Sequence, residues 1–276
     1  MPDKPSLETQ IHQYSGVFSC ENQTHQQSLA AYQNRRQRLI ERLGRPLFIR
    51  GVLNEPYQRH PWVMGPLSYI QEPLMRYLSG IDQVGCALLI TKTETTVFLP
   101  KQDLEKCFWE GPSFSFGDAT HNALMTALLG VDKVADISDC ETSLCHLCSE
   151  MKLPELSLYI PTTLSKKGAS IDECSSAQKQ MEKYLQKKYP SLRIIPLLFE
   201  DTAHRLCLDE EELSVLRTAI EKTARIYTSV CAKAKSAKTE TDIFQSLMSL
   251  IYAETPFGTS FAPIVASGDN ACTLHY

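Results

Sequence analysis

Three cysteines and a histidine lie close together in the middle of the sequence. The spacing C-x4-C-x2-C, known from plant-type iron–sulfur ligation, is formed by Cys140, Cys145 and Cys148. Cys174 is a candidate fourth ligand, and together with His146 the same cysteines could instead hold zinc. The stretch DCETSLCHLCSEMKL, however, has the pattern of one amphipathic helix and lacks the glycines of a cluster-binding loop. We therefore favour a structural helix, capped by Ser138 or Asp139, over a metal site.

A second candidate residue is the histidine near the end of the given sequence. His275 lies in SFAPIVASGDNACTLHY, residues 260–276, whose pattern predicts a strand, a tight turn and a second strand. Gly-Asp-Asn at 268–270 has the composition of a turn that needs positive backbone dihedrals. An imidazole can donate a hydrogen bond to a carbonyl oxygen or an oxyanion, so His275 is a candidate substrate ligand. The alternative is a histidine satisfied inside a sheet.

The segments before this region alternate between helical and extended patterns. Apolar residues recur at helical spacing over 29–43, where Gly44 and Pro46 end the helix. Two strand-like runs, 87–91 and 95–99, are separated by the polar KTE and predict a hairpin. Helices and strands then alternate to about residue 200. This order predicts an α/β layered domain in which the hairpin adds antiparallel pairing to a mixed sheet.

A different pattern begins at Leu208. Asp209 can cap a long helix, and Thr239 can cap a second helix over about 240–253. An apolar stripe follows the first of these helices and consists of Leu213, Leu216, Ile220, Ala224 and Tyr227. We expect three parts: a loosely ordered extension over 1–30, an α/β domain over 31–205, and the incomplete start of an α+β domain over 206–276.

Composition limits the possible function classes. The chain has 276 residues and a formal charge of -4, which gives no electrostatic reason to bind nucleic acid or an anionic membrane. No apolar run is long enough for a signal peptide or a membrane span, so we expect a cytoplasmic protein. Its 10 cysteines are then expected to be mostly reduced thiols. Trp62 and Trp109 are expected to be core or domain-interface anchors.

Several of these segments together resemble a known family. LDEEELSVLRTAIEKTARIY, the TETDI helix start and above all PIVASGDNACTLHY resemble the start of the pita-bread metallopeptidase domain of Xaa-Pro aminopeptidases and prolidases. RYLSGID, the hairpin and FLPKQDLEKCFWEG look like the creatinase/aminopeptidase P N-terminal domain that precedes it. The resemblance assigns 31–205 to that N-terminal domain and 206–276 to the truncated start of the catalytic domain.

The resemblance implies an enzyme that removes the N-terminal residue from peptides with proline in second position, using a pair of metal ions, typically manganese. It carries one functional residue onto this sequence: His275 matches the substrate-binding histidine. The family's metal ligands follow that position, so we expect no catalytic or metal-binding residue in this chain, no bound manganese and no activity of the chain alone. The alternatives are a non-catalytic interaction protein that pairs with itself or with a homologue, and one chain of a split enzyme.

Overall fold

The computed structural model describes residues 27–51, 71–110, 113–150, 154–159, 176–255, 258–274 and 276. Of these residues, those up to Cys207 form one compact unit, and those from Leu208 onward belong to a second. Within the described part of the chain, none of the helices combines the length and the apolar composition needed to cross a bilayer.

The first unit is built on one mixed sheet of six strands in the order β4-β3-β2-β1-β5-β6. The strands are β1 (Leu47–Arg50), β2 (Ala87–Ile90), β3 (Thr95–Leu99), β4 (Lys133–Asp136), β5 (Glu155–Tyr159) and β6 (Arg193–Pro196). β1 and β2, and β2 and β3, pair antiparallel, whereas β3 with β4, β1 with β5, and β5 with β6 pair parallel. The predicted α/β class and mixed sheet are therefore confirmed.

The predicted hairpin is formed by β2 and β3. Its register pairs Ala87 with Phe98 and Ile90 with Thr95. The turn is closed by Thr91, whose backbone N–H donates to the Glu94 carbonyl at 2.8 Å and whose hydroxyl accepts from the Glu94 N–H at 2.9 Å. A threonine side chain can replace a backbone partner in this way, which explains why a turn with no glycine forms here.

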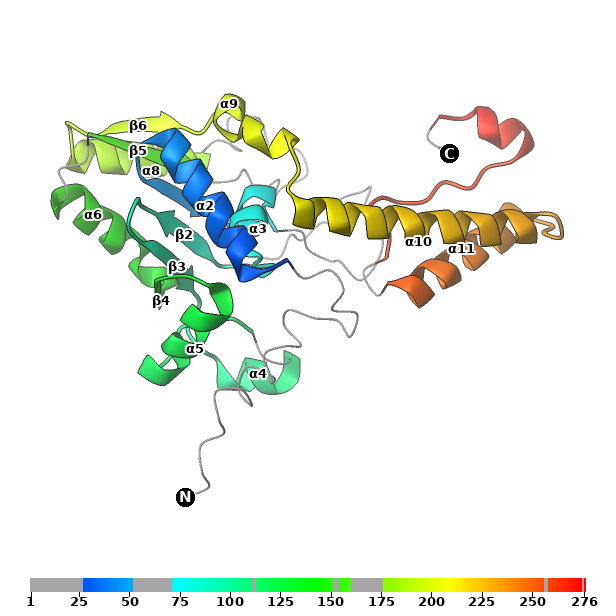
Figure 1. Cartoon of the computed structure of the whole chain (residues 1–276), viewed down its shortest axis with the longest axis horizontal. Helices are drawn as coiled ribbons and strands as arrows, with labels where there is room; N and C mark the ends of the chain where they lie inside the picture. Colours follow the sequence, from blue (N-terminus) through cyan, green and yellow to red (C-terminus); the bar gives the residue numbers. More distant parts are fainter. Residues whose placement is uncertain are drawn as a thin grey trace, which may run out of the picture. The chain divides into compact units, whose positions relative to one another are not determined.

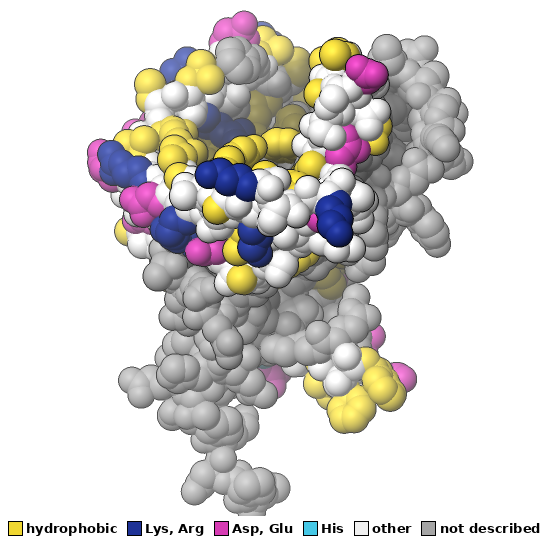
Figure 2. Space-filling view, turned by 90° about the vertical axis from the view of Figure 1, so that its right-hand side faces the viewer, with side chains coloured by type: hydrophobic (Ala, Val, Ile, Leu, Met, Phe, Trp, Pro, Cys, Tyr) yellow, Lys and Arg dark blue, Asp and Glu magenta, His cyan; other side chains and the backbone are white. Residues whose placement is uncertain are grey.

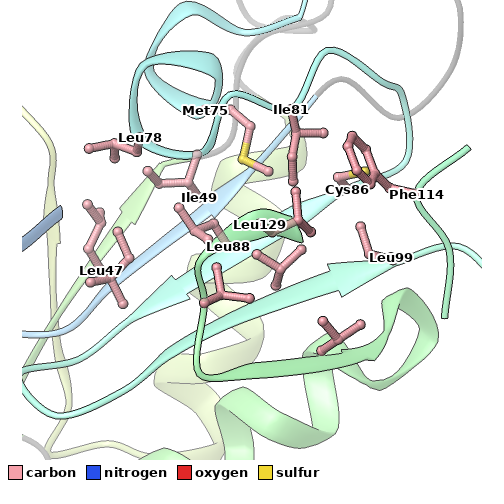
Figure 3. Packing of buried hydrophobic residues seen from close by; sticks show 14 of the residues in the cluster. Leu47, Ile49, Met75, Leu78, Ile81, Cys86, Leu88, Leu99, Phe114 and Leu129 are labelled. Carbon is pink, nitrogen blue, oxygen red and sulfur yellow. The ribbon is translucent and has the colours of Figure 1, made fainter. Parts of the chain in front are cut away.

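Side chains that alternate along the strands separate two hydrophobic clusters, one on each face of the sheet. One face is covered by α2 (Leu29–Leu43), α3 (Pro73–Ser79) and α5 (Ala119–Leu129). Figure 3 shows this cluster, in which Met75, Leu78 and Ile81 lie over Ile49 and Leu88. The other face is covered by α6 (Cys140–Glu150) and α8 (Ser176–Lys188) (Figure 1). The short helices are α4 (Leu104–Glu110), α9 (Phe199–Thr202), η2 (Ile137–Asp139) and η3 (Ala203–Leu206).

Helix α2 has the predicted bounds. It begins after Ser28, whose hydroxyl caps the Ala31 N–H, and ends at Gly44, which is left-handed with φ 67°. A buried arginine of this helix, Arg36, donates to the carbonyl oxygens of Leu78 and Gly130. Burial lowers the pKa of Arg36 to about 10. The guanidinium thus satisfies the carbonyl groups at the ends of α3 and α5 and ties both helices to α2.

The η2 turn precedes α6, and the carboxylate of Asp136 caps this turn by accepting from the Ser138 N–H at 2.9 Å. The predicted cap of α6 by Ser138 or Asp139 stays a prediction. Of the two roles predicted for Trp109, the core role is wrong, because 75% of the residue is exposed at the end of α4, next to Phe108, whereas the domain-interface role stays a prediction. Apolar character predicted burial there, but the short helix turns this side chain outward. Trp62 lies outside the described residues.

The second unit contains α10 (Glu210–Ala234), α11 (Glu240–Glu254) and the turn η4 (Gly268–Cys272). Both predicted caps are confirmed, because Asp209 and Thr239 each form a reciprocal capping box with the third helical residue. The two helices are joined near Glu254, which forms an ion pair with Arg225 at 3.0 Å and accepts from the Lys222 ammonium at its carbonyl oxygen.

The predicted apolar stripe of α10 is largely exposed in the described structure. Ile220 is 58% and Tyr227 is 65% exposed, whereas Ile226 and Ile251 are the buried hydrophobic residues described for α10 and α11. Figure 2 shows hydrophobic side chains at the surface among acidic and basic ones. The periodicity therefore predicted the helix correctly, and the apolar face that it defines is largely exposed among the described residues.

Candidate functional site

The cysteines of the central constellation are part of α6, as predicted. Cys145 and Cys148 are buried in the hydrophobic cluster on that face of the sheet, Cys140 is half-buried against it, and His146 is exposed. Burial raises the pKa of Cys140 to about 12 and that of Cys148 to about 11, so both are held as neutral thiols. Cys174 lies outside the described residues. The structure thus places these cysteines in packing positions.

The described residues do not offer a metal site. No group of three or more His, Cys, Asp or Glu side chains among them is arranged to hold a metal ion.

The closing segment differs from the prediction. The turn is present as η4, and Gly268 has the expected positive φ of 53°. The described residues on either side of it, from Ser260 to Leu274, form no strand. A strand requires a neighbour to exchange backbone hydrogen bonds with, and the described residues of this unit provide none. His275 itself lies outside the described residues, so its role stays a prediction.

What fixes this segment is the carboxylate of Glu240, the first residue of α11. Its Oε1 accepts from the backbone N–H of Ser267 at 2.6 Å, from the hydroxyl of Ser267 at 3.1 Å and from the side-chain amide of Asn270 at 3.1 Å. Its Oε2 accepts from the hydroxyl of Tyr276 at 2.8 Å. We call this set of residues, Glu240, Ser267, Asn270 and Tyr276, the Glu240 clamp.

The clamp has a clear electrostatic signature. Hydrogen bonds from Tyr276, Asn270 and Ser267 to the charged carboxylate lower the pKa of Glu240 to about 2. The same carboxylate raises the pKa of the Tyr276 hydroxyl. The acceptor is therefore ionised at neutral pH, and its hydrogen bonds are charge-assisted. They hold the η4 turn and the residue immediately after His275 against the start of α11.

Sequence reasoning missed Glu240 and Tyr276. The Thr-Glu-Thr-Asp stretch predicts only the start of a helix. Thr239 and Asp242 form the capping box at that start. The partners of Glu240 are 27 to 36 residues away along the chain, and no local pattern specifies pairs at that separation. An acidic residue at the first helical position also has an ordinary explanation in the helix dipole, so it gave no separate signal.

Comparison with known proteins shows what the first unit is similar to. The model of the aminopeptidase P N-terminal domain matches residues 32–154, which run from α2 through α6 of the six-stranded unit. Residues 32–154 are thus similar to the aminopeptidase P N-terminal domain. The resemblance predicted from the sequence is thereby confirmed.

Curated relatives extend the likeness beyond that domain. Probable Xaa-Pro aminopeptidases of Ajellomyces dermatitidis and Sordaria macrospora are 25% identical over 214 residues and 27% identical over 202 residues. These alignments cover 77% and 72% of this chain but 41% and 38% of the relatives. The chain thus spans about two fifths of the length of these relatives.

Solved structures share the fold. Escherichia coli aminopeptidase P, as a variant in complex with substrate, is 21% identical with a TM-score of 0.68, over 91% of this chain and 55% of that one. Proline aminopeptidase P II from Yersinia pestis is 18% identical with a TM-score of 0.66, over 91% and 56% of the two chains. The Escherichia coli enzyme was also solved in a zinc-substituted form with product. The similarity therefore includes most of both units of the chain.

Proposed function

We propose that this chain supplies the N-terminal domain and the beginning of the catalytic domain of a metal-dependent Xaa-Pro aminopeptidase. In this proposal residues 31–205 are the N-terminal domain, and residues 206–276 begin the pita-bread domain. The observation that carries it is the aminopeptidase P N-terminal match on the six-stranded unit, followed by two helices and a closing segment that continue the same fold. The substrate class is a peptide with proline in second position, as the relatives' names state for those proteins.

The contribution of these residues to the reaction is to position a substrate ligand. In the proposal, His275 donates a hydrogen bond to the carbonyl oxygen next to the scissile bond. The neighbouring Tyr276 is held by the ionised carboxylate of Glu240, and the η4 turn before it is held through Ser267 and Asn270. Contacts that hold the residues on either side of His275 reduce the conformational freedom that the backbone there loses when the peptide binds.

The paired metal ions belong to the protein that carries this segment together with the ligands that the resemblance places after it. We propose that residues 1–276 alone do not hydrolyse Xaa-Pro peptides. Manganese-dependent release of an N-terminal residue by the purified 276-residue chain would contradict this part of the proposal. A cytoplasmic location, and pairing with itself or with a homologue, stay predictions from the sequence; sedimentation of the folded chain tests the pairing.

The role of His275 is tested by substitution in the product of the complete reading frame, assayed with Mn²⁺ on an Xaa-Pro peptide. Removing one donor to a developing oxyanion lowers kcat by about 100-fold, so His275→Ala is expected to have an effect of that order on kcat/KM. His146→Ala, which changes an exposed histidine of α6, is the matched control and keeps wild-type activity. Unchanged activity in His275→Ala, with the control also active, would remove this residue from the site.

A further inference from the structure

The first unit contains a cavity of about 290 Å³ between α2, the turn of the β2–β3 hairpin and the connection from α5 to β4. All of its lining residues belong to that unit. The volume is at the lower end of the roughly 300–1,000 Å³ typical of ligand pockets, so the cavity suits a small molecule. Its wall is mostly polar and includes two cationic and two anionic side chains: Arg36, Lys92, Glu94 and Asp132.

Arg36 is the buried cation of this wall, with 3% of the residue exposed. Its Nη1 donates to the carbonyl oxygen of Leu78 at 2.8 Å and its Nη2 to the carbonyl oxygen of Gly130. Among the described residues, no carboxylate forms an ion pair with it. Burial lowers the pKa of Arg36, and the negative charge of Asp132 offsets only part of that effect. A carboxylate on a bound molecule would therefore neutralise a buried charge that only carbonyl groups contact.

The two carboxylates of the wall are each held through one oxygen atom. Oδ2 of Asp132 accepts from the backbone N–H of Thr95 at 2.7 Å, and the Asp132 N–H donates to the Thr95 carbonyl oxygen at 3.1 Å. Oε1 of Glu94 accepts from the hydroxyl of Thr96 at 2.8 Å. In the part of the chain that the structure describes, the second oxygen of each carboxylate has no hydrogen-bond donor. Each carboxylate therefore keeps an acceptor for an ammonium group.

These charges disfavour a ligand of a single sign. The two carboxylates repel an anion, and Arg36 and Lys92 repel a cation. Arg36 and Asp132 interact electrostatically but form no ion pair, so their charged groups are separated. A molecule that carries a carboxylate and an ammonium on one carbon atom complements both groups. We propose that this cavity binds a free α-amino acid, whose carboxylate contacts Arg36 and whose ammonium contacts Asp132.

The side chain of the amino acid is expected to be apolar, because the buried residues Ile40, Ile90 and Val131 also line the cavity. An amino acid with a small branched side chain, such as valine, is therefore a suitable probe. This binding site uses no residue of the segment that carries His275, and it is independent of the proposed peptidase chemistry.

The test titrates the purified 276-residue chain with L-valine and follows the backbone amides by heteronuclear NMR. We expect saturable shifts at residues 91–95 and 130–132, which line the cavity. Isovalerate is valine without the ammonium, and isobutylamine is valine without the carboxylate. Each is expected to bind at least about tenfold more weakly, because each leaves one set of charged groups in the cavity without its partner. The assay contains no peptide and no metal, so its outcome is separate from that of the peptidase test.

A substitution tests the contact with the ammonium. Asp132→Asn removes the negative charge, while the amide oxygen keeps an acceptor for the Thr95 N–H. We expect this variant to bind L-valine at least about tenfold more weakly. Asp139→Asn, the same change at an exposed aspartate outside the cavity, is the matched control and keeps the wild-type affinity. Far-ultraviolet circular dichroism of both variants checks that the fold is unchanged.

The proposal is overturned if L-valine shows no saturable binding at millimolar concentrations, or if it shifts amides away from the cavity only. It is also overturned if isovalerate or isobutylamine binds as tightly as L-valine, because the cavity would then not recognise both charges. Wild-type affinity in a folded Asp132→Asn chain would have the same consequence.

Discussion

At the scale of single residues, the ionised carboxylate of Glu240 is the feature that organises the closing segment. Its pKa of about 2 lies below the ordinary value of 4.5, so the clamp contributes stability fully above about pH 4.5. That contribution is lost as the pH falls through about 2, when the carboxylate becomes protonated in the folded state as well. The clamp is therefore expected to be intact throughout the neutral range.

Substitution of this residue tests the clamp. Glu240→Gln removes the charge that the Tyr276 and Asn270 donors share, and amides of residues 268–274 are expected to exchange with solvent faster at pH 7. Hydrogen exchange followed by mass spectrometry measures this. Glu210→Gln is the matched control, because Glu210 is the first residue of α10, as Glu240 is of α11, and its side chain is exposed. Equal exchange in both variants would show that the clamp does not hold the segment.

Caps and clamps differ in how far the sequence could predict them. Asp209 and Thr239 were found from the sequence because a capping box is complete within four consecutive positions. The partners of Glu240 were not found, because they depend on how the chain returns after α11. Trp109 failed for a related reason: residue type predicts average burial, while the orientation of α4 decides the exposure of this particular side chain.

At the scale of elements, the contact between α2 and α3 depends on a glycine. Gly80 ends α3 with φ 72°, and a Cβ at this position would lie 2.7 Å from the ring of Tyr32 in α2. Gly44 ends α2 with a similar φ of 67°, but a Cβ there would meet nothing within 4 Å. The two positions share the backbone requirement and differ in the steric one.

This difference gives a paired prediction for stability. Gly44→Ala is expected to cost about 1 kcal/mol, the strain of a left-handed alanine. Gly80→Ala carries the same strain and also displaces the Tyr32 ring, so its total cost is expected to be about 2–4 kcal/mol. Urea unfolding followed by far-ultraviolet circular dichroism measures both. Equal losses of stability would mean that the ring of Tyr32 does not pack on Gly80.

Element types were predicted well where the pattern was local. The bounds of α2 and the hairpin strands followed from periodicity, Gly44 and the polar turn. The predicted strands within 260–276 were wrong because an alternating pattern describes an extended segment equally well, paired or not. Pairing adds backbone hydrogen bonds from elsewhere in the chain, which the local sequence does not specify.

At the scale of the whole molecule, the order of the strands in the sheet could not be predicted from the sequence. β1 pairs with β2 on one side and with β5, more than a hundred residues later, on the other. The alternation of helices and strands predicted a mixed α/β sheet, but several strand orders satisfy it. The resemblance of the RYLSGID region predicted the aminopeptidase P N-terminal domain that residues 32–154 match, and the likeness in fold extends over 91% of the chain.

In the proposed function, these residues are part of a peptidase specific for proline in second position. The most direct measurement compares kcat/KM of the complete reading-frame product, with Mn²⁺, on matched Xaa-Pro and Xaa-Ala peptides. We expect the N-terminal residue to be released from the Xaa-Pro peptide at least about 100-fold more efficiently, about 2.7 kcal/mol in transition-state stabilisation. Equal efficiency on the two peptides, or no cleavage of either by the folded, metal-loaded protein, would contradict it.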